Sequence, residues 1–212
     1  NSFIIFANGE YLTGDTGYAG IPMTQHHNTL LFAGKGQAKE GSGHDAFDDV
    51  SYERLDRIRI VDVSVQKNVV RVVGDATMAY EPEVGVRKFV RTIEYAPAEG
   101  FRIRDEVETN KPTIITSLIH ADGGIDKKAN NQFMISAGAA RLFIEPLEPN
   151  DLIGSIDVNV LTAPGPPGAV DKGERQERGY LLRLSTKDAV TSTRFVISLK
   201  VAQRNGLRSS LR

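Results

Sequence analysis

The residues best suited to chemistry lie together in residues 15–45. This stretch begins with Asp15 and holds three of the four histidines, His26, His27 and His44. An imidazole titrates near neutral pH and is a common metal ligand, so it can move a proton or hold a cation. Glycines interrupt the stretch and apolar runs flank it, which is typical of loops that strands hold in place. We therefore expect the functional site here.

Asp15 and His27 are the candidate metal ligands. Asp15 follows the second of two strand-like segments, and His27 comes just before the apolar run at 29–33. Two strand ends that converge could place both side chains on one cation, and Zn²⁺ is the usual ion for imidazole with carboxylate. Two ligands do not complete a zinc site, so further ligands would have to come from elsewhere.

Composition argues against several classes of protein. The chain has 212 residues, of which 40% are hydrophobic and 25% charged, and its net charge is −1. A balance so close to neutral predicts no nucleic-acid-binding face. No apolar run reaches the roughly 20 residues that a membrane span needs. The chain has no cysteine for disulfide or thiol chemistry, and its length fits one large domain or two small ones.

The hydrophobic pattern is almost entirely that of β-strands. Asn8-Gly9 between two apolar segments predicts a hairpin, and a change of phase after Ile60 predicts a β-bulge. No segment keeps a helical period, although residues 51–57 come nearest, and residues 162–179 form the one long polar loop. The predicted strands are 2–6, 10–14, 29–37, 57–65, 69–75, 86–95, 101–108, 112–120, 132–137, 139–145, 156–161, 179–186 and 191–201. Such a series of short strands predicts an all-β fold, a large antiparallel β-sandwich similar to a supersandwich.

One hairpin can be registered from the sequence. Residues 96–100 form its loop, so the flanking strands pair outward from there, with the paired side chains on one face. The expected cross-strand pairs are Tyr95–Phe101, Ile93–Ile103, Arg91–Asp105 and Phe89–Val107. Arg91 and Asp105 then meet within an apolar face, where a buried charge needs a partner. An internal ion pair explains them, and an arginine that awaits an anionic substrate is the functional alternative.

Several sequence patterns occur together in a fixed order. The two most specific are G-x-x-L-x-x-D-x-G-Y at 9–18 and H-N-T-L at 27–30. Further segments are GDATMAYEP, RTIEY, RIRDEVE and SLIH, and finally GYLLRLST with TRFVISLKV. In this order, and over nearly the whole chain, they resemble the β-sheet domain of heparinase II/III-like polysaccharide lyases. The resemblance is strongest to the branch that contains oligo-alginate and glycosaminoglycan lyases.

The resemblance implies a fold, an activity and a metal. These enzymes join an amino-terminal (α/α) toroid to a large antiparallel β-sandwich and cleave uronic-acid polysaccharides by β-elimination in the cleft between them. In several members the residues that match Asp15 and His27 bind zinc, with a third ligand that here would precede Asn1. The chain, residues 1–212, is then one sandwich domain without its toroid and its catalytic tyrosine, so we expect it to be inactive alone. The family also implies a periplasmic or secreted protein.

The same resemblance suggests roles for further residues. β-Elimination needs a base for the proton α to the uronate carboxylate and an acid for the departing oxygen. His26 is the expected contributor from this chain, or His27 if no metal holds it, and Tyr80 could line the cleft. His44 and Gln37 are candidates for binding an acidic polysaccharide or oligosaccharide. Tyr80 and His44 also have structural explanations, as packing and as a solvated loop.

Two other functions stay open, although the sequence lacks features that each would call for. A non-catalytic carbohydrate-binding or scaffolding sandwich would call for an exposed aromatic platform, but the chain has no tryptophan and only 7% aromatic residues. A metal-dependent hydrolase of another kind would call for H-x-x-E-H or Ser-His-Asp spacing, and neither occurs. His120 ends an apolar run, where a histidine is more often a satisfied core residue than a ligand.

Overall fold

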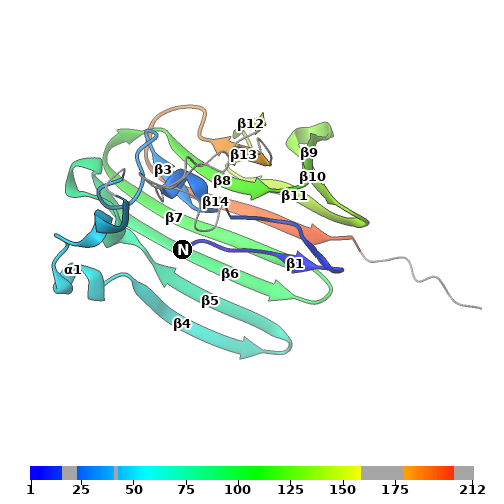
Figure 1. Ribbon diagram of the computed structural model, residues 1–212, viewed down its shortest axis with the longest axis horizontal. Helices are drawn as coiled ribbons and strands as arrows, with labels where there is room; N and C mark the ends of the chain where they lie inside the picture. Colours follow the sequence, from blue (N-terminus) through cyan, green and yellow to red (C-terminus); the bar gives the residue numbers. More distant parts are fainter. Residues whose placement is uncertain (16–22, 41–42, 159–178, 203–212) are drawn as a thin grey trace, which may run out of the picture.

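The structure is a computed structural model, and it describes residues 1–15, 23–40, 43–158 and 179–202. Its strands form antiparallel sheets of two, eight and four strands (Figure 1). This is the antiparallel β-sandwich that the sequence predicts. No helix within the described ranges is long and apolar enough to cross a membrane.

The elements follow one another as short strands with brief helical turns between them. The strands are β1 Phe6–Ala7, β2 Glu10–Tyr11, β3 Leu30–Phe32, β4 Arg59–Gln66, β5 Val69–Asp75, β6 Val86–Ala96, β7 Gly100–Thr113, β8 Ile115–Ala121, β9 Gly124–Lys127, β10 Phe133–Ala137, β11 Ala140–Glu148, β12 Ile153–Val158, β13 Tyr180–Ser185 and β14 Val190–Val201. The helical turns are η1 Thr24–His26, η2 Gly43–Phe47, α1 Tyr52–Asp56, η3 Thr77–Ala79, η4 Pro82–Val84 and η5 Ala129–Asn131. Most of the predicted long loop, residues 162–178, lies outside the described residues.

The eight-stranded sheet runs in the order β4-β5-β6-β7-β14-β11-β10-β9. Its central hairpin, β6–β7, has the predicted register, with all four expected cross-strand pairs. The predicted bulge is also present, because the pairing of β4 with β5 shifts between Ile60 and Asp62. The first hairpin, β1–β2, turns at Asn8 and Gly9, whose φ angles of 54° and 83° are the left-handed values that a two-residue turn requires. Local sequence signals are therefore enough to specify these hairpins.

The four-stranded sheet, in the order β12-β13-β8-β3, covers only part of the large sheet (Figure 1). β3 lies over β6, where the rings of Phe32 and Phe89 are 6.4 Å apart, and β13 packs near β9. Side chains between the two sheets, such as Phe133 and Phe195, are fully buried. The face of the large sheet that carries Phe89 is called the inner face below. It continues beyond β3, through β5, to the edge strand β4.

The N-terminal segment lies across the inner face (Figure 1). The Asn1 side-chain amide donates to Gly74 O of β5 at 3.0 Å, and Arg91 Nη1 donates to Asn1 O at 2.6 Å. A Cβ at position 74 would lie 2.2 Å from Asn1 Oδ1. Glycine near the end of β5 thus marks the place where another segment of the chain comes close to the sheet.

Candidate functional site

The structure brings Asp15 and His27 into contact. Asp15 follows β2, and His27 leaves the short helix η1 in an extended conformation. The His27 Nδ1 and Asp15 Oδ2 atoms are 2.6 Å apart, and the two side chains keep 34% and 19% of their surface exposed. When Nδ1–H donates to the carboxylate, Nε2 is the basic nitrogen. The pair can therefore offer an oriented imidazole to a proton or a metal ion.

Asn28 fixes the backbone on both sides of this pair. It is fully buried, and its side-chain amide donates to Gly14 O at 2.8 Å, next to Asp15. Its Oδ1 accepts a hydrogen bond from the His120 backbone N–H at 2.6 Å. Because Asn28 directly follows His27, one amide side chain connects both loops to β8. The sequence shows Asn28 only as part of the H-N-T-L pattern, and nothing in that pattern reveals its partners.

His120 is buried below the pair, with 2% of its surface exposed. Its Nδ1 lies 3.1 Å from Asn28 Oδ1. Burial lowers the pKa of His120 from its ordinary 6.5 to about 4, so the ring is neutral at physiological pH. It is the satisfied core histidine that its position after an apolar run predicts.

His26 is half-buried beside His27. Burial lowers the pKa of His26 from its ordinary 6.5, and the neighbouring His27 lowers it further. Its Nδ1 is buried and has no hydrogen-bond partner among the described residues. A buried polar atom without a partner costs about 1–3 kcal/mol, so such an atom in a folded protein calls for an explanation. A neutral imidazole can accept a proton from a bound molecule only through a nitrogen that the molecule reaches, and the buried Nδ1 is not such an atom.

Arg91 and Asp105 form the predicted ion pair below Asn28. Their side chains are 2% and 0% exposed, and Arg91 Nε and Nη2 donate to the two carboxylate oxygens at 2.6 and 2.7 Å. Arg91 Nη1 also donates to Asn28 O at 2.7 Å and to Asn1 O. A guanidinium held by both carboxylate oxygens and two carbonyls favours the structural explanation over an anionic substrate.

The other predicted site residues are Tyr80, Gln37 and His44. Tyr80 is buried in the core, where its hydroxyl donates to Leu30 O at 2.7 Å and burial raises its pKa. This favours packing, and a catalytic role for Tyr80 stays a prediction. Gln37 is half-buried, and its backbone N–H donates to Thr24 Oγ1. The backbone of His44 lies in η2, but its side chain is outside the described part.

The described residues do not by themselves make up a zinc site. Among them, no group of three or more His, Cys, Asp and Glu side chains could hold a metal ion. A catalytic zinc takes three protein ligands and a structural zinc takes four. Asp15 and His27 have suitable chemistry, but their 2.6 Å contact is a hydrogen bond. Two zinc ligands lie roughly 3.3 Å apart, so a shared ion would require the pair to open or His27 to bind through Nε2.

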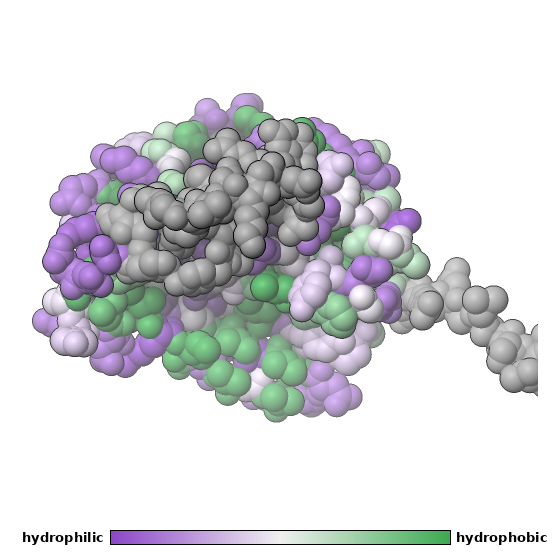
Figure 2. Space-filling view, viewed as in Figure 1, coloured by the Kyte–Doolittle hydropathy of each residue, from purple (hydrophilic) through white to green (hydrophobic). Residues whose placement is uncertain are grey.

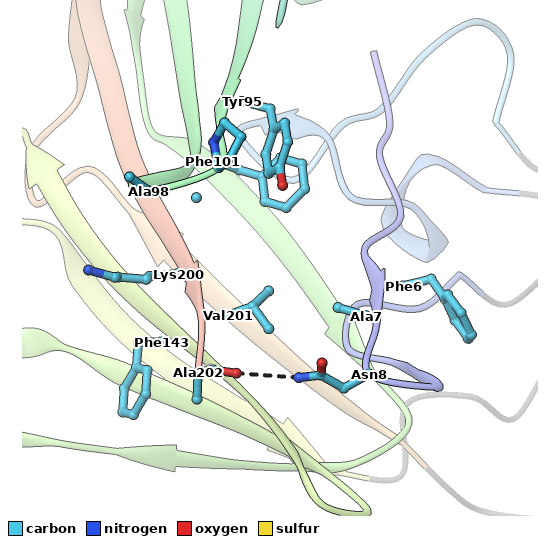
Figure 3. A pocket seen from close by; sticks show the side chains of 12 residues that line it. Phe6, Ala7, Asn8, Tyr95, Ala98, Phe101, Phe143, Lys200, Val201 and Ala202 are labelled. Atoms are coloured by element: carbon cyan, nitrogen blue, oxygen red, sulfur yellow. Dashed lines mark hydrogen bonds between the residues drawn. The ribbon is translucent and has the colours of Figure 1, made fainter. Parts of the chain in front are cut away.

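A groove of about 640 Å³ lies away from the Asp15–His27 pair, where the β1–β2 hairpin meets the β6–β7 turn and the end of β14 (Figure 3). Tyr95, Phe101 and Val201 point into it, whereas the Lys200 side chain at its edge points away. The rings of Tyr95 and Phe101 lie 4.7 Å apart. Sequence reasoning missed this groove, because residues from five separate strands build it.

The family model described as "Heparinase II/III-like, C-terminal" matches residues 1–148. The chain belongs to this heparinase II/III-like polysaccharide lyase family. The residues beyond 148 complete the same sandwich, because β14 lies between β7 and β11 in the large sheet. The family resemblance noted in the sequence is thereby confirmed.

Solved heparinase structures have the same fold. A heparinase III gene product has a TM-score of 0.68 at 13% identity, with 96% of this chain and 30% of that chain covered. A heparan sulfate lyase from Pedobacter heparinus has a TM-score of 0.63 at 13% identity, with the same coverage. This chain thus spans less than a third of the length of either protein. No curated protein matches the chain.

Proposed function

We propose that this chain is the β-sandwich part of a polysaccharide lyase that cleaves a uronic-acid-containing polysaccharide by β-elimination. The observation that carries the proposal is the match to the heparinase II/III-like C-terminal family over residues 1–148. The heparinase fold supports it, and so does a pair of adjacent histidines beside a carboxylate at the sheet edge. In the same proposal the chain is inactive without the amino-terminal toroid, because it spans less than a third of its structural relatives.

The reaction suits the chemistry of His26. A base removes the proton on the carbon next to the uronate carboxylate, the electron pair forms a carbon–carbon double bond, and the glycosidic oxygen leaves with a proton. Burial lowers the pKa of His26, which favours its neutral ring. Its Nδ1 is buried, so Nε2 is the atom that would have to reach the sugar. His26 can accept that proton through this nitrogen. The Asp15–His27 pair lies next to it and would help to orient the sugar.

Zinc remains part of the proposal. Asp15 and His27 would supply two ligands, and further ligands would come from outside the described residues. A bound ion would add positive charge beside the acidic sugar. We also propose a periplasmic or secreted location, where such a polysaccharide is met. These points follow from the family resemblance and from the donor chemistry of the pair.

The lyase is tested by absorbance of the unsaturated product on heparan sulfate and on alginate. The 212-residue chain should form no product, and the intact protein should form it. His26→Ala in the intact protein should lower turnover by about 10²–10⁴-fold, the usual contribution of a general base. Gln66→Ala, on the edge strand β4, is the matched control and should leave turnover unchanged. Turnover by the chain alone would show that no further domain is needed, and an intact protein inactive on every uronate polysaccharide would refute the lyase.

Zinc binding is tested separately by calorimetric titration of the intact protein. His27→Ala should weaken binding at least tenfold, because a lost ligand is not replaced by water without cost. Gln66→Ala should bind zinc as the wild type does. Equal affinity in all three proteins would remove Asp15 and His27 from the metal assignment.

The groove in Figure 3 supports a second candidate function, carbohydrate binding without catalysis. Tyr95 and Phe101 offer ring faces for sugar packing. If the groove binds sugar, the 212-residue chain should retain acidic oligosaccharides on its own. Tyr95→Ala and Phe101→Ala should each abolish retention, whereas His26→Ala should not. Retention that is lost only with His26→Ala would assign the sugar to the Asp15–His27 region instead.

A further inference from the structure

The inner face of β4 and β5 carries a row of apolar side chains. The register pairs Val63 with Val72 and Val65 with Val70, and Val72 in turn pairs with Ile93 of β6. Paired residues share a face, so this row continues the face that carries Arg91 and Phe89. We call it the β4–β5 patch, and its members are Ile60, Val63, Val65, Val70 and Val72.

The four-stranded sheet does not reach the patch. Ile60, Val63 and Val65 are 65%, 61% and 69% exposed, although Phe89 and Ile103 on the same face are 0% and 2% exposed. Figure 2 shows the apolar side chains gathered over β4 and β5, below the part that the small sheet covers. Single exposed apolar residues are ordinary, but a contiguous group on an edge strand marks a contact surface.

The opposite face of the same two strands carries charged side chains together with Val69 and Val73. There the Arg71 side chain forms an ion pair with Asp62 of β4 and lies 3.9 Å from Glu94 of β6. The two strands therefore have one apolar face and one mixed face with exposed charges, and antiparallel sheets are commonly covered on the apolar side. This alternation of residues calls for another part of the protein to cover the apolar face.

The N-terminus lies next to the patch and points to what covers it. Asn1 packs over Gly74 of β5, which is paired with Ile60. Polypeptide attached there would leave the sheet beside β5 and β4.

The relatives contain such polypeptide. The matching family model describes a C-terminal part, and the chain covers 30% of the heparinase III gene product. We propose that the β4–β5 patch is the docking surface for the polypeptide that precedes Asn1 in the intact protein, which packs apolar side chains on it. The inference rests on the proposed function only in taking the chain as part of a longer lyase.

Thiol labelling tests this directly, because the chain has no cysteine of its own. Val65→Cys places a thiol in the patch, and Ile153→Cys places the matched control on β12, where Ile153 is 55% exposed. Each variant is made in the 212-residue chain and in the intact protein. A maleimide is added, and the labelled peptide is followed by mass spectrometry. In the chain both thiols should react at similar rates, whereas in the intact protein Val65→Cys should slow at least tenfold and Ile153→Cys should not change.

Other results would overturn the proposal. If Val65→Cys reacts equally fast in the chain and in the intact protein, the preceding polypeptide does not cover the patch. If it reacts slowly in the chain alone, and faster on dilution, a second copy of the chain covers it instead. The labelling needs no substrate, so it is independent of the lyase assay. A protected thiol in an intact protein without lyase activity would refute the proposed function and leave the docking surface in place.

Discussion

The two halves of the inner face of the large sheet have the same kind of sequence and opposite surroundings. On β6 and β7, Phe89 and Ile103 are buried under the small sheet, the N-terminal segment and the loops around His27. On β4, Val63 and Val65 continue the same face and remain mostly exposed. Alternation along a strand therefore shows which side chains share a face, but cover comes from another element of the structure.

The covered half should show its largest effect at the buried ion pair. Asp105→Ala leaves the Arg91 guanidinium buried without its carboxylate, which should lower the free energy of unfolding by about 3–5 kcal/mol. Asp62→Ala, on the outer face of β4, breaks an exposed pair with Arg71 and should cost about 0–1 kcal/mol. Urea unfolding of both variants makes the comparison. Equal losses would mean that Arg91 finds another partner or water.

Matched apolar truncations compare the two halves directly. Ile103→Ala removes a side chain that is 2% exposed and should cost about 2–5 kcal/mol through a cavity. Ile60→Ala removes one that is 65% exposed and should change the unfolding free energy by no more than about 0.5 kcal/mol. Denaturant titration of the 212-residue chain measures both. A large loss from Ile60→Ala would show that the patch is already covered in this chain.

The covered half should also respond to acid through His120. Its folded pKa of about 4 lies below the ordinary 6.5, so folding favours the neutral ring. This stabilisation is complete above pH 6.5 and is lost as the pH falls toward 4, with a total of roughly 3 kcal/mol. The charge of Asp15 opposes the shift, and those of His26 and His27 add to it. Unfolding free energies between pH 7 and 5 should fall for the wild type and stay flatter for His120→Gln; parallel slopes would contradict the assignment.

The smallest effect is expected on the uncovered half. Val63→Thr keeps the shape of a side chain that is 61% exposed, so stability should change by less than about 0.5 kcal/mol. Binding of an apolar fluorescent dye to the 212-residue chain should nevertheless decrease, because the patch loses apolar surface. Dye fluorescence that does not change would mean that the dye binds elsewhere, for example in the groove beside Tyr95.

The features that the sequence predicted are those that neighbours in the chain determine. A turn signal at Asn8-Gly9 and a loop at 96–100 each connect adjacent strands, so the pairing follows from counting residues. The Arg91–Asp105 pair follows from the same count. The order of strands across the large sheet does not, because β14 inserts between β7 and β11 from far along the chain.

The candidate site was only partly predictable for the same reason. Asp15 and His27 stand out by residue type, and the contact between them is observed. The role of Asn28 depends on partners in three separate segments, among them Gly14 and His120, and no local pattern encodes them. Tyr80 looks equally suited to a cleft or a core until the packing around its ring is known.

Arg91 binds residues that are far apart in the sequence and are therefore synthesised at different times. Its guanidinium binds Asp105, which is 14 residues away, and also Asn28 O and Asn1 O, which are 63 and 90 residues away. Contacts between near positions form first, because closing a long loop costs more chain entropy. The β6–β7 hairpin therefore forms first, and the N-terminal segment docks on it later. On the ribosome residues 1–7 remain without these partners until Arg91 has been synthesised, and this interval is when a chaperone has most to protect.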